Sequence, residues 1–455
     1  MPHQSYDAVI IGSGQAGTPL ISKLGKAGWK TALVERAHYG GTCINEGCTP
    51  TKTLIASARA AHVVRRAADY GVMASAPVIN FHKVIQRKNE IVKSWSERDK
   101  EKLAKTPNVT LLFGHARFID SHFLEVSSAG GTQIIEGKTI FIDTGCRPAP
   151  PHFPGSDQIP ILNSTTVMDL DVLPEHLVII GGGYVGLEFG QFFRRLGSRV
   201  TIVEAGKIFL VHEDRDIADA VRRVLEEEGI PIKTGTNVTN AKLAGRSIEI
   251  ETSDGILECS HVLYAGGRVP NSDDLRLVKA GIQTDERGYI RVNPKLETNI
   301  KGVYALGDVT GSPAFTHIAY DDYRIVRDNL LHGGNRTTTG RLVPSVTFID
   351  PQLARIGITE TEAKSQGLSY RIATMPMSHV ARAVEVDEQK GLMKAVIGED
   401  DRVLGATIFG IEGGEIMSMI EIVMMSGLKT SDLRNGIFAH PTLAESLNNL
   451  FAYTG

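Results

Sequence analysis

Two of the four cysteines in this 455-residue chain, Cys43 and Cys48, lie five positions apart in a glycine-rich stretch just before a proline. In a regular α-helix this spacing separates the Cα atoms by roughly 8–9 Å, whereas a disulfide needs about 4.4–6.8 Å. A bridge therefore requires a distorted turn, and a strained disulfide is easily reduced. The pair is typical of a catalytic dithiol, and two buried free cysteines are the alternative.

A histidine near the end of the chain is the second candidate for chemistry. His440 precedes a Pro-Thr pair and stands five residues before Glu445. A histidine held by a carboxylate can give or take a proton near neutral pH. A histidine before a proline is more often a turn residue, and only proximity to the cysteines would favour a catalytic role.

A dinucleotide-binding pattern precedes the cysteines. The apolar run Tyr6–Ile11 is followed by G-x-G-x-x-G, a helical stretch from Thr18 to Lys26, and a second apolar run, Thr31–Val34. The glycines let the backbone approach a pyrophosphate at a helix N-terminus, and an acid after the second strand accepts from a ribose hydroxyl. The residues concerned are Gly12, Gly14, Gly17 and Glu35.

The same pattern recurs in the middle of the chain. Leu177–Ile180 leads into a glycine turn, a helix through Leu196 and the strand Val200–Val203. Its glycines and acid are Gly181, Gly183, Gly186 and Glu204. The first glycine and the acid are 23 residues apart in both copies (35 − 12 and 204 − 181). We therefore expect two working dinucleotide sites, the alternative being a duplicated fold with one dead site.

The acid of the second copy bears on the choice of coenzyme. Glu204 is suited to a free ribose 2′-hydroxyl and repels a 2′-phosphate. The only basic residue close behind it is Lys207. NADH is therefore favoured over NADPH.

Composition narrows the class of protein. The chain is 42% hydrophobic and 22% charged, with a formal net charge of −3. It therefore lacks the excess of positive charge that binding to nucleic acid or to an anionic membrane requires. The apolar run at the N-terminus is too short to span a bilayer and has no basic segment before it. So few cysteines in a long chain favour a reducing cytoplasm, and Cys146 and Cys259 have no cysteine partner nearby in sequence.

The remaining pattern predicts an α/β protein: two Rossmann-like dinucleotide-binding domains followed by an α+β domain. Strands are expected near Val109–Phe113, Phe123–Val126 and Ile140–Asp143, and the Pro-rich run Arg147–Gly155 is interpreted as a linker. Asp308 follows a short apolar strand, and ligands bind at the C-terminal ends of strands in α/β folds. Asp308 is therefore a candidate ligand-binding residue, the alternative being a turn residue. From about Arg341 the sequence has no nucleotide-binding motif. The Met-rich helix from Glu415 to Met425 is expected to lie in the hydrophobic core or at a subunit interface rather than at a ligand site.

Together these motifs resemble the FAD-dependent pyridine nucleotide-disulfide oxidoreductases, which include glutathione reductase, dihydrolipoyl dehydrogenase and mercuric reductase. The resemblance covers nearly the whole chain. It implies an FAD-binding domain split between 1–150 and 272–340, an NAD-binding domain at 151–271 and a dimer-interface domain at 341–455. It also implies a homodimer in which His440 serves the partner's site.

The resemblance also implies roles for individual residues. Cys48 would be the charge-transfer thiol beside the flavin, and Cys43 the interchange thiol that meets substrate. Lys52 and Glu188 would pair beside the flavin, and His440 with Glu445 would be the acid–base couple. The implied FAD contacts are Gly12, Gly14, Gly17, Glu35, Lys52 and Asp308. Further implied cofactor-binding residues are Gly41, Thr42, Ala116, Thr144, Gly145 and Gly267. The implied NADH contacts are Gly181, Gly183, Gly186 and Glu204. No metal site is expected.

The implied reaction carries electrons from NADH through FAD and the Cys43–Cys48 disulfide to a small oxidant. Three stretches are most similar to the reactive-chlorine-resistance reductases, which resemble mercuric reductases and reduce hypothiocyanous acid: Phe209–Asp219, Phe315–Val326 and Ile437–Phe451. Mercuric reductases typically end in a cysteine pair and have Tyr in place of His440, whereas this chain ends Phe451-Ala452-Tyr453-Thr454-Gly455.

Two alternatives stay open. The first is dihydrolipoyl dehydrogenase, although that enzyme usually has I-P-S-K where this chain has Thr49-Pro50-Thr51-Lys52. The second is a silent dinucleotide-binding sensor or interaction protein, which leaves Cys43, Cys48 and His440 unexplained. Glutathione reductase is disfavoured, because glutathione reductases usually have basic residues in place of Glu204.

Overall fold

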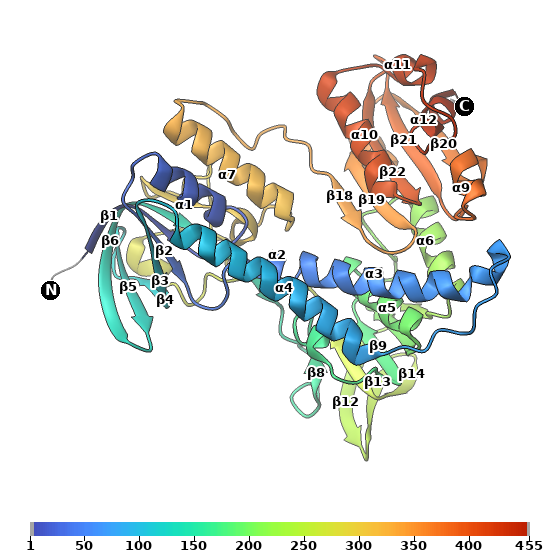
Figure 1. Cartoon of the computed structure of the whole chain (residues 1–455), viewed down its shortest axis with the longest axis horizontal. Coiled ribbons are helices and arrows are strands. Elements are labelled where there is room, and N and C mark those ends of the chain that lie inside the picture. Colours follow the sequence, from blue (N-terminus) through green and yellow to red (C-terminus); the bar gives the residue numbers. More distant parts are fainter. Residues whose placement is uncertain (1–3, 453–455) are drawn as a thin grey trace. The chain divides into compact units, whose positions relative to one another are not determined.

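A computed structural model describes residues 4–452, with its helices and strands labelled in Figure 1. Contacts divide the chain into two compact units. The first comprises the chain up to Thr53, His82–Pro150 and Gly267–Arg341; the second comprises Leu54–Phe81, Pro151–Gly266 and the chain from Leu342. The last residues used in the comparison with mercuric reductases, 453–455, lie outside the described part. Within residues 4–452 no helix is long and apolar enough to cross a membrane.

The first unit is built on a seven-stranded sheet in the order β3-β2-β1-β6-β5-β4, with β17 pairing β6. The strands β3, β2, β1, β6 and β17 run parallel, while β4 and β5 extend the sheet as antiparallel strands. Every residue of β2 is buried, as expected for a strand covered on both faces. The bounds are β1 Gln4–Ile11, β2 Thr31–Glu35, β3 Val109–Phe113, β4 His115–Phe118, β5 Phe123–Ser128, β6 Gly131–Ile142 and β17 Val303–Ala305.

Helices of the first unit pack on this sheet and present the glycine turn and the cysteines. Helix α1 (Gly17–Lys26) contacts α7 (Thr316–Leu331), and both contribute to one buried cluster with Leu20, Leu24 and Tyr323. Helix α2 (Gly41–Asn45) is short, and α3 (Cys48–Arg65) passes from the first unit into the second. Further elements of this unit are α4 Phe81–Ala104 and the 3-10 helices η3 Leu277–Ala280 and η4 Gly307–Thr310, whereas the 3-10 helix η1 Ala67–Tyr70 belongs to the second unit.

The second unit contains a five-stranded parallel sheet in the order β11-β10-β9-β15-β8. Helix α5 (Tyr184–Leu196) contacts β9 and β10, repeating the arrangement of α1 on β1 and β2. The antiparallel strands β12, β13 and β14 form a separate sheet. The bounds are β8 Ile161–Leu162, β9 His176–Ile180, β10 Arg199–Glu204, β11 Ile232–Thr234, β12 Val238–Ala244, β13 Ser247–Thr252, β14 Gly255–Cys259, β15 His261–Tyr264, α6 Arg215–Glu227 and η2 Thr166–Asp169.

The C-terminal part of the second unit is an antiparallel sheet in the order β18-β19-β22-β21-β20 with α10 (Gly413–Ser426) against it (Figure 1). Its core contains Ile416, Met417 and Ile420 of α10, whereas Ile422 and Met425 on the same helix are exposed. The bounds are β18 Ser345–Thr347, β19 Gln352–Gly357, β20 Tyr370–Pro376, β21 Leu392–Gly398, β22 Val403–Gly410, α8 Glu360–Ser365, α9 Ala381–Glu385, α11 Thr430–Asn435, α12 Ser446–Ala452 and η5 Met377–His379.

The predicted linker Arg147–Gly155 differs from the structure at its first residues. Strand β7 (Cys146–Pro148) pairs antiparallel with β16 (Arg268–Pro270), so Arg147 lies in a strand. Two proline-containing strands can pair in this way because a two-stranded ribbon needs few ladder hydrogen bonds. The residues from Ala149 to Gly155 lie outside strands and helices.

The segment Phe209–Asp219, singled out by its sequence, attaches α6 to the C-terminal sheet within the second unit. Asp214, just before α6, accepts hydrogen bonds from the backbone N–H groups of Glu360 and Thr361 at 3.0 and 2.9 Å. The buried Lys394 of β21 lies 3.2 Å from Asp214. The neighbouring carboxyl of Glu213 lacks one hydrogen bond: its Oε2 is buried without a hydrogen-bond partner among the described residues.

Replacing Glu213 by Gln is expected to raise the unfolding temperature at pH 8 and leave it nearly unchanged at pH 5. Burial raises the pKa of Glu213 from 4.5 to about 7, with Asp214 and Glu362 adding to the effect and Arg355 opposing it. The unfolded chain therefore loses this proton first, and stability falls by about 3 kcal/mol as the pH rises through that window. Glutamine cannot ionise, so it removes this loss.

Thermal unfolding followed by circular dichroism at both pH values measures the effect. The control is Glu175→Gln, a carboxylate whose side chain is 85% exposed. An equal gain at pH 5 and pH 8 would contradict the explanation.

Candidate functional site

The first glycine turn is closely packed against the ends of its neighbouring strands. Gly12 has φ +97, and a Cβ there would meet the Asp143 carbonyl oxygen at 2.3 Å. A Cβ on Gly17 would lie 2.7 Å from the Gly12 carbonyl oxygen. Glu35, at the end of β2, accepts hydrogen bonds from the backbone N–H and hydroxyl of Ser13 at 2.9 and 2.7 Å. The turn is therefore fixed by its own acid and needs glycine at both positions.

The second glycine turn repeats this geometry. Gly181 has φ +115, and a Cβ on Gly186 would lie 2.1 Å from the Gly181 carbonyl oxygen. Glu204 accepts from the backbone N–H groups of Gly182 and Gly206 at 2.8 and 2.7 Å. Glu35 makes the equivalent bonds to Ser13 and Ala37. Both copies thus orient the acid at the turn, as a ribose-binding carboxylate requires.

The two turns differ at the end of the third strand. In the first, Asp143 follows β6 and its buried carboxylate accepts from the Gly17 N–H at 2.6 Å. In the second, Ala265 occupies the corresponding place after β15. Burial raises the pKa of Asp143 well above its ordinary value, and the neighbouring Asp308 and Asp322 raise it further. The Asp143 side chain therefore braces the first turn through the Gly17 N–H, which Ala265 cannot do in the second.

The cysteine segment is joined directly to the first glycine turn. A Cβ on Gly41 would lie 2.8 Å from the Cα of Gly14, so these two backbones are in contact. The Gly40 N–H donates to the Ser13 hydroxyl at 3.2 Å, and the Gln15 side chain donates to the Gly40 carbonyl at 3.1 Å. The glycines before the cysteines are therefore packed directly on the first glycine turn.

The predicted interruption of helix between the cysteines is present. Cys43 belongs to α2, Glu46 leaves the helical conformation at φ −139, and Cys48 is the first residue of α3. Neither cysteine is in a disulfide in the structure, and both sulfurs contact one hydroxyl. Thr316 Oγ1 lies 3.0 Å from Cys43 Sγ and 3.3 Å from Cys48 Sγ.

The surroundings of Cys43, Cys146 and Cys259 raise the pKa values of these three thiols. The hydrogen bond from Cys48 and burial raise the pKa of Cys43 strongly, while Thr316 and the charge of Lys52 lower it. Burial raises the pKa of Cys146 to about 11 and that of Cys259 to about 12. Cys146 and Cys259 are therefore unreactive thiols at neutral pH.

The residues that follow Asp143 in the first unit are hydrogen-bonded to the segment 268–271. Thr144 donates its hydroxyl to the Asn271 carbonyl at 2.8 Å, and the Asn271 amide donates back to the Thr144 carbonyl at 2.8 Å. Arg268 donates to the Cys146 carbonyl, yet its Nε is buried without a partner among the described residues. Burial raises the pKa of Asp308, and the Arg268 charge opposes the rise. An unpartnered guanidinium N–H beside a glycine turn fits an anionic dinucleotide such as FAD.

The other predicted residues lie at defined places in their own units. In the first unit Ala116 is buried on β4, Thr42 is exposed on α2, and Gly145 and Gly267 have φ +64 and +124. Lys52 is on the part of α3 that belongs to the same unit. In the second unit the buried Glu188 accepts from the Phe348 N–H at 2.8 Å. The pairing of Lys52 with Glu188 remains a prediction.

The predicted histidine and glutamate are paired within the second unit. His440 Nδ1 lies 2.8 Å from Glu445 Oε2, and the histidine side chain is 67% exposed. Thr442 shapes this turn by donating to the Ala439 carbonyl at 2.7 Å and accepting from the Glu445 N–H at 3.2 Å. A carboxylate facing Nδ1 fixes the proton there, so Nε2 is the atom that can accept a proton.

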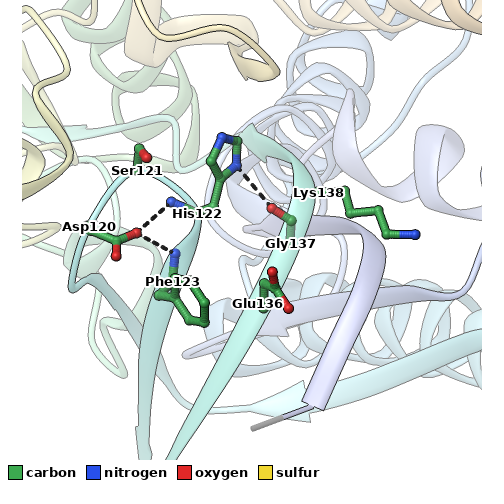
Figure 2. A pocket seen from close by; sticks show the side chains of 7 residues that line it. All are labelled: Asp120, Ser121, His122, Phe123, Glu136, Gly137 and Lys138. Atoms are coloured by element: carbon green, nitrogen blue, oxygen red, sulfur yellow. Dashed lines mark hydrogen bonds between the residues drawn. The ribbon is translucent and has the colours of Figure 1, made fainter.

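A hollow of about 580 Å³ elsewhere in the first unit is lined by residues of the turn before β5 and by the facing part of β6 (Figure 2). Its Asp120 and His122 side chains already have partners. Asp120 accepts from the His122 and Phe123 N–H groups at 2.9 and 3.1 Å, and His122 Nδ1 contacts the Gly137 carbonyl at 3.1 Å. None of the predicted site residues lines it. Within residues 4–452 no group of three or more His, Cys, Asp or Glu side chains is arranged to hold a metal ion.

Three residues of the site were not predicted from the sequence: Asp143, Arg268 and Thr316. Asp143 directly precedes the predicted Thr144-Gly145 pair at a strand end, and Arg268 follows the predicted Gly267. Those positions were signals that could have identified them. Thr316 lies 273 residues from Cys43, and no spacing rule connects the two.

Comparison with known proteins agrees with this geometry. Residues 6–322 match the model of the pyridine nucleotide-disulphide oxidoreductase family, and residues 343–451 match its dimerisation domain. The chain is 40% identical to the probable pyridine nucleotide-disulfide oxidoreductase RclA of Escherichia coli, covering 98% of this chain and 99% of the relative. It is 34% identical to the mercuric reductase of Streptomyces lividans (98% and 95% covered) and 34% identical to the dihydrolipoyl dehydrogenase of Thermus scotoductus (98% and 96%).

Solved structures of related proteins have the same fold as this chain. The HOCl-induced flavoprotein disulfide reductase RclA from E. coli superposes with a TM-score of 0.91 at 40% identity, covering 98% of this chain and 99% of that one. A Cu(II) complex of the same relative gives 0.92 at 39% identity, with 99% of each chain covered. The dimerisation domain supports a homodimer. This chain belongs to the pyridine nucleotide-disulphide oxidoreductase family and is an FAD- and pyridine-nucleotide-binding flavoenzyme.

Proposed function

We propose that the protein uses NADH to reduce a small oxidant through the Cys43–Cys48 pair. The observation that carries this proposal is the contact of both sulfurs with Thr316 in a segment packed against the first glycine turn. When bound, FAD accepts a hydride from the nicotinamide and delivers two electrons to the cysteine pair. In this proposal residues 1–150 and 267–340 hold FAD and residues 151–266 hold NADH, because Gly267 and Arg268 belong to the first unit.

Within the dithiol, Cys48 carries the negative charge and Cys43 is the attacking thiol. The start of α3 favours a thiolate at Cys48, because the N-terminal end of a helix is positive. The raised pKa of Cys43 is consistent with one shared negative charge that resides on Cys48. His440, oriented by Glu445, takes the proton from Cys43 as it attacks; it serves the partner's cysteines in the homodimer.

The oxidant class we favour is hypothiocyanous acid. Cys43 displaces water from HOSCN to form a sulfenyl thiocyanate, and Cys48 then displaces thiocyanate to form the disulfide. Two thiols are oxidised and one HOSCN is reduced to SCN⁻ and water. Similarity to the HOCl-induced relative supports this class, and the mercuric reductase relative makes Hg²⁺ a second acceptor to test.

A single acceptor panel tests the function. The purified protein with NADH is assayed against HOSCN, Hg²⁺, Cu²⁺, lipoamide and oxidised glutathione, with kcat/KM as the measure. We expect HOSCN to exceed the others by at least tenfold. Lipoamide turnover equal to the best oxidant would favour dihydrolipoyl dehydrogenase, to which the chain is also similar. Full FAD binding without any reductase activity would favour the silent sensor.

Coenzyme choice gives a separate prediction. The parent enzyme should prefer NADH, because the Glu204 carboxylate is held at the second turn by two backbone N–H groups and repels a 2′-phosphate. Glu204→Arg should narrow the preference by at least tenfold, measured as the ratio of kcat/KM for NADH and NADPH. Glu204→Gln removes the charge at nearly constant shape and should have a smaller effect. Equal efficiency of the parent with both coenzymes would reject this role for Glu204.

A further inference from the structure

The hydroxyl of Thr316 lies within hydrogen-bonding distance of the sulfur atoms of both Cys43 and Cys48. Its Oγ1 lies 3.0 Å from Cys43 Sγ and 3.3 Å from Cys48 Sγ. Both distances are within hydrogen-bonding range for sulfur, whose larger radius makes its hydrogen bonds longer than those of oxygen. Thr316 is the first residue of α7 and is half-buried.

Thr316 is held in place by the rest of α7. Two turns further along, the fully buried Asp322 accepts from the Gly307 N–H at 2.8 Å and from Arg341 at 2.6 Å. Ile318 and Tyr323 on the same helix are also buried. Because α7 is fixed in the core of the first unit, the hydroxyl is held at a constant position between the sulfurs. Its rotation about one bond is the main freedom that remains.

A hydroxyl has one proton to donate and two lone pairs that accept. It can therefore satisfy a thiol and a thiolate together, but it cannot donate to two thiolates. The thiol S–H donates to the threonine oxygen while the threonine O–H donates to the thiolate. The second bond is charge-assisted and is the stronger of the two.

We propose that Thr316 is a catalytic residue of the reduced dithiol: its hydroxyl, which donates to Cys43 Sγ in this structure, donates to whichever sulfur is the thiolate and accepts the S–H of the other, so that it donates to Cys48 when Cys48 carries the charge. This assignment deepens the proposed function and rests on it. The hydroxyl contacts both reacting sulfur atoms. When the charge changes place, the S–H proton passes to the threonine oxygen as the hydroxyl proton passes to the thiolate, so one proton is moved between the sulfurs without solvent and both hydrogen bonds reverse.

The surroundings of Cys43 correspond to the state in which Thr316 donates to that sulfur. The Lys52 charge acts on Cys43 from the first turns of α3. Thr316 and Lys52 both lower the pKa of Cys43, whereas the sulfur of Cys48 and burial raise it. The hydroxyl therefore lets the pair hold a single negative charge in a partly buried place.

The test compares Thr316→Val with Thr316→Ser in the FAD-loaded protein. Valine keeps the branched shape and loses the hydroxyl, while serine keeps the hydroxyl. Each protein is reduced with dithiothreitol, desalted anaerobically and exposed to iodoacetamide from pH 4 to pH 9. Mass spectrometry then gives the alkylation rate of each cysteine. The long-wavelength thiolate–flavin absorbance over the same pH range is a second readout, and flavin content and unfolding temperature check the fold.

For Thr316→Val we expect the apparent pKa of the Cys48 thiolate to rise by about one unit, since a charge-assisted hydrogen bond is lost. Cys48 alkylation below that pKa should slow about tenfold, and the absorbance should fall in parallel. Thr316→Ser should match the parent. A merely structural role would lower the flavin content or unfolding temperature of the valine variant without moving this profile.

Coincident pH profiles for the valine and serine variants would overturn the assignment. The failure of the proposed function has a different signature. If Cys48→Ser retains the long-wavelength absorbance, the role of Cys48 is wrong. If that absorbance is lost in Cys48→Ser but unchanged in Thr316→Val, only the inference about Thr316 fails.

Discussion

Replacing Cys48 by Ser is expected to abolish the long-wavelength absorbance that NADH produces anaerobically and to lower oxidant turnover by about a thousandfold or more. Serine cannot supply a thiolate to the flavin or resolve the adduct formed on Cys43. Transfer of a hydride from NADH to the flavin should remain, because the glycine turns and their acids are untouched. Anaerobic titration with NADH and steady-state turnover measure both effects.

Two further variants separate the roles of the cysteines. Cys43→Ser should retain the absorbance and lose turnover, since the thiolate remains while the attacking thiol is gone. Cys146→Ser is the matched control: Cys146 is buried, its pKa is raised to about 11, and the variant should keep both properties. Retention of the absorbance in Cys48→Ser would overturn the assignment of that cysteine.

The second large effect is expected at Gly186. In Gly186→Ala the new Cβ would stand 2.1 Å from the Gly181 carbonyl oxygen, so the turn or α5 must shift. NADH should then reduce the flavin at least a hundredfold more slowly, while dithionite reduces it normally and FAD content stays at the parent level. Stopped-flow absorbance measures the reduction rate, and flavin absorbance of the purified protein gives the content.

Two other glycines are the controls. A Cβ on Gly183 meets no atom within 4 Å, so Gly183→Ala should keep the unfolding temperature and yet weaken NADH binding by blocking backbone approach to the pyrophosphate. In Gly17→Ala a Cβ meets the Gly12 carbonyl oxygen at 2.7 Å, and this variant should lose FAD instead. Loss of FAD from Gly186→Ala would contradict the assignment of the two turns to different cofactors.

Much of the fold was predictable because the glycine turns are local. Each is encoded within some 25 consecutive residues, and the expected strand–turn–helix–strand order is present in both copies. The α/β class with a C-terminal dimerisation domain and the family itself are confirmed. The break in the helix at Glu46 followed from the distance a disulfide requires, again a property of a short segment.

Contacts between distant segments were not predictable. The pairing of β7 with β16 turned part of a predicted linker into a strand, because its partner lies more than 100 residues away. Asp143 reaches Gly17 only because β6 pairs in parallel with β1. Thr316 reaches the cysteines because α7 packs on the same sheet as α1. Spacing along the chain carries no information about such neighbours.

The contrast between the two glycine turns bears on how long each ligand stays bound. The first turn is enclosed, with Gly14 in contact with Gly41 on one side and Asp143 on the other, whereas Gly183 in the second is open. A ligand at an enclosed turn leaves only after neighbouring backbone loosens, so its residence time is long. A ligand at an open turn exchanges freely. In the proposed function this contrast predicts that FAD is kept at the first turn through many cycles and that NADH is exchanged at the second turn in every cycle.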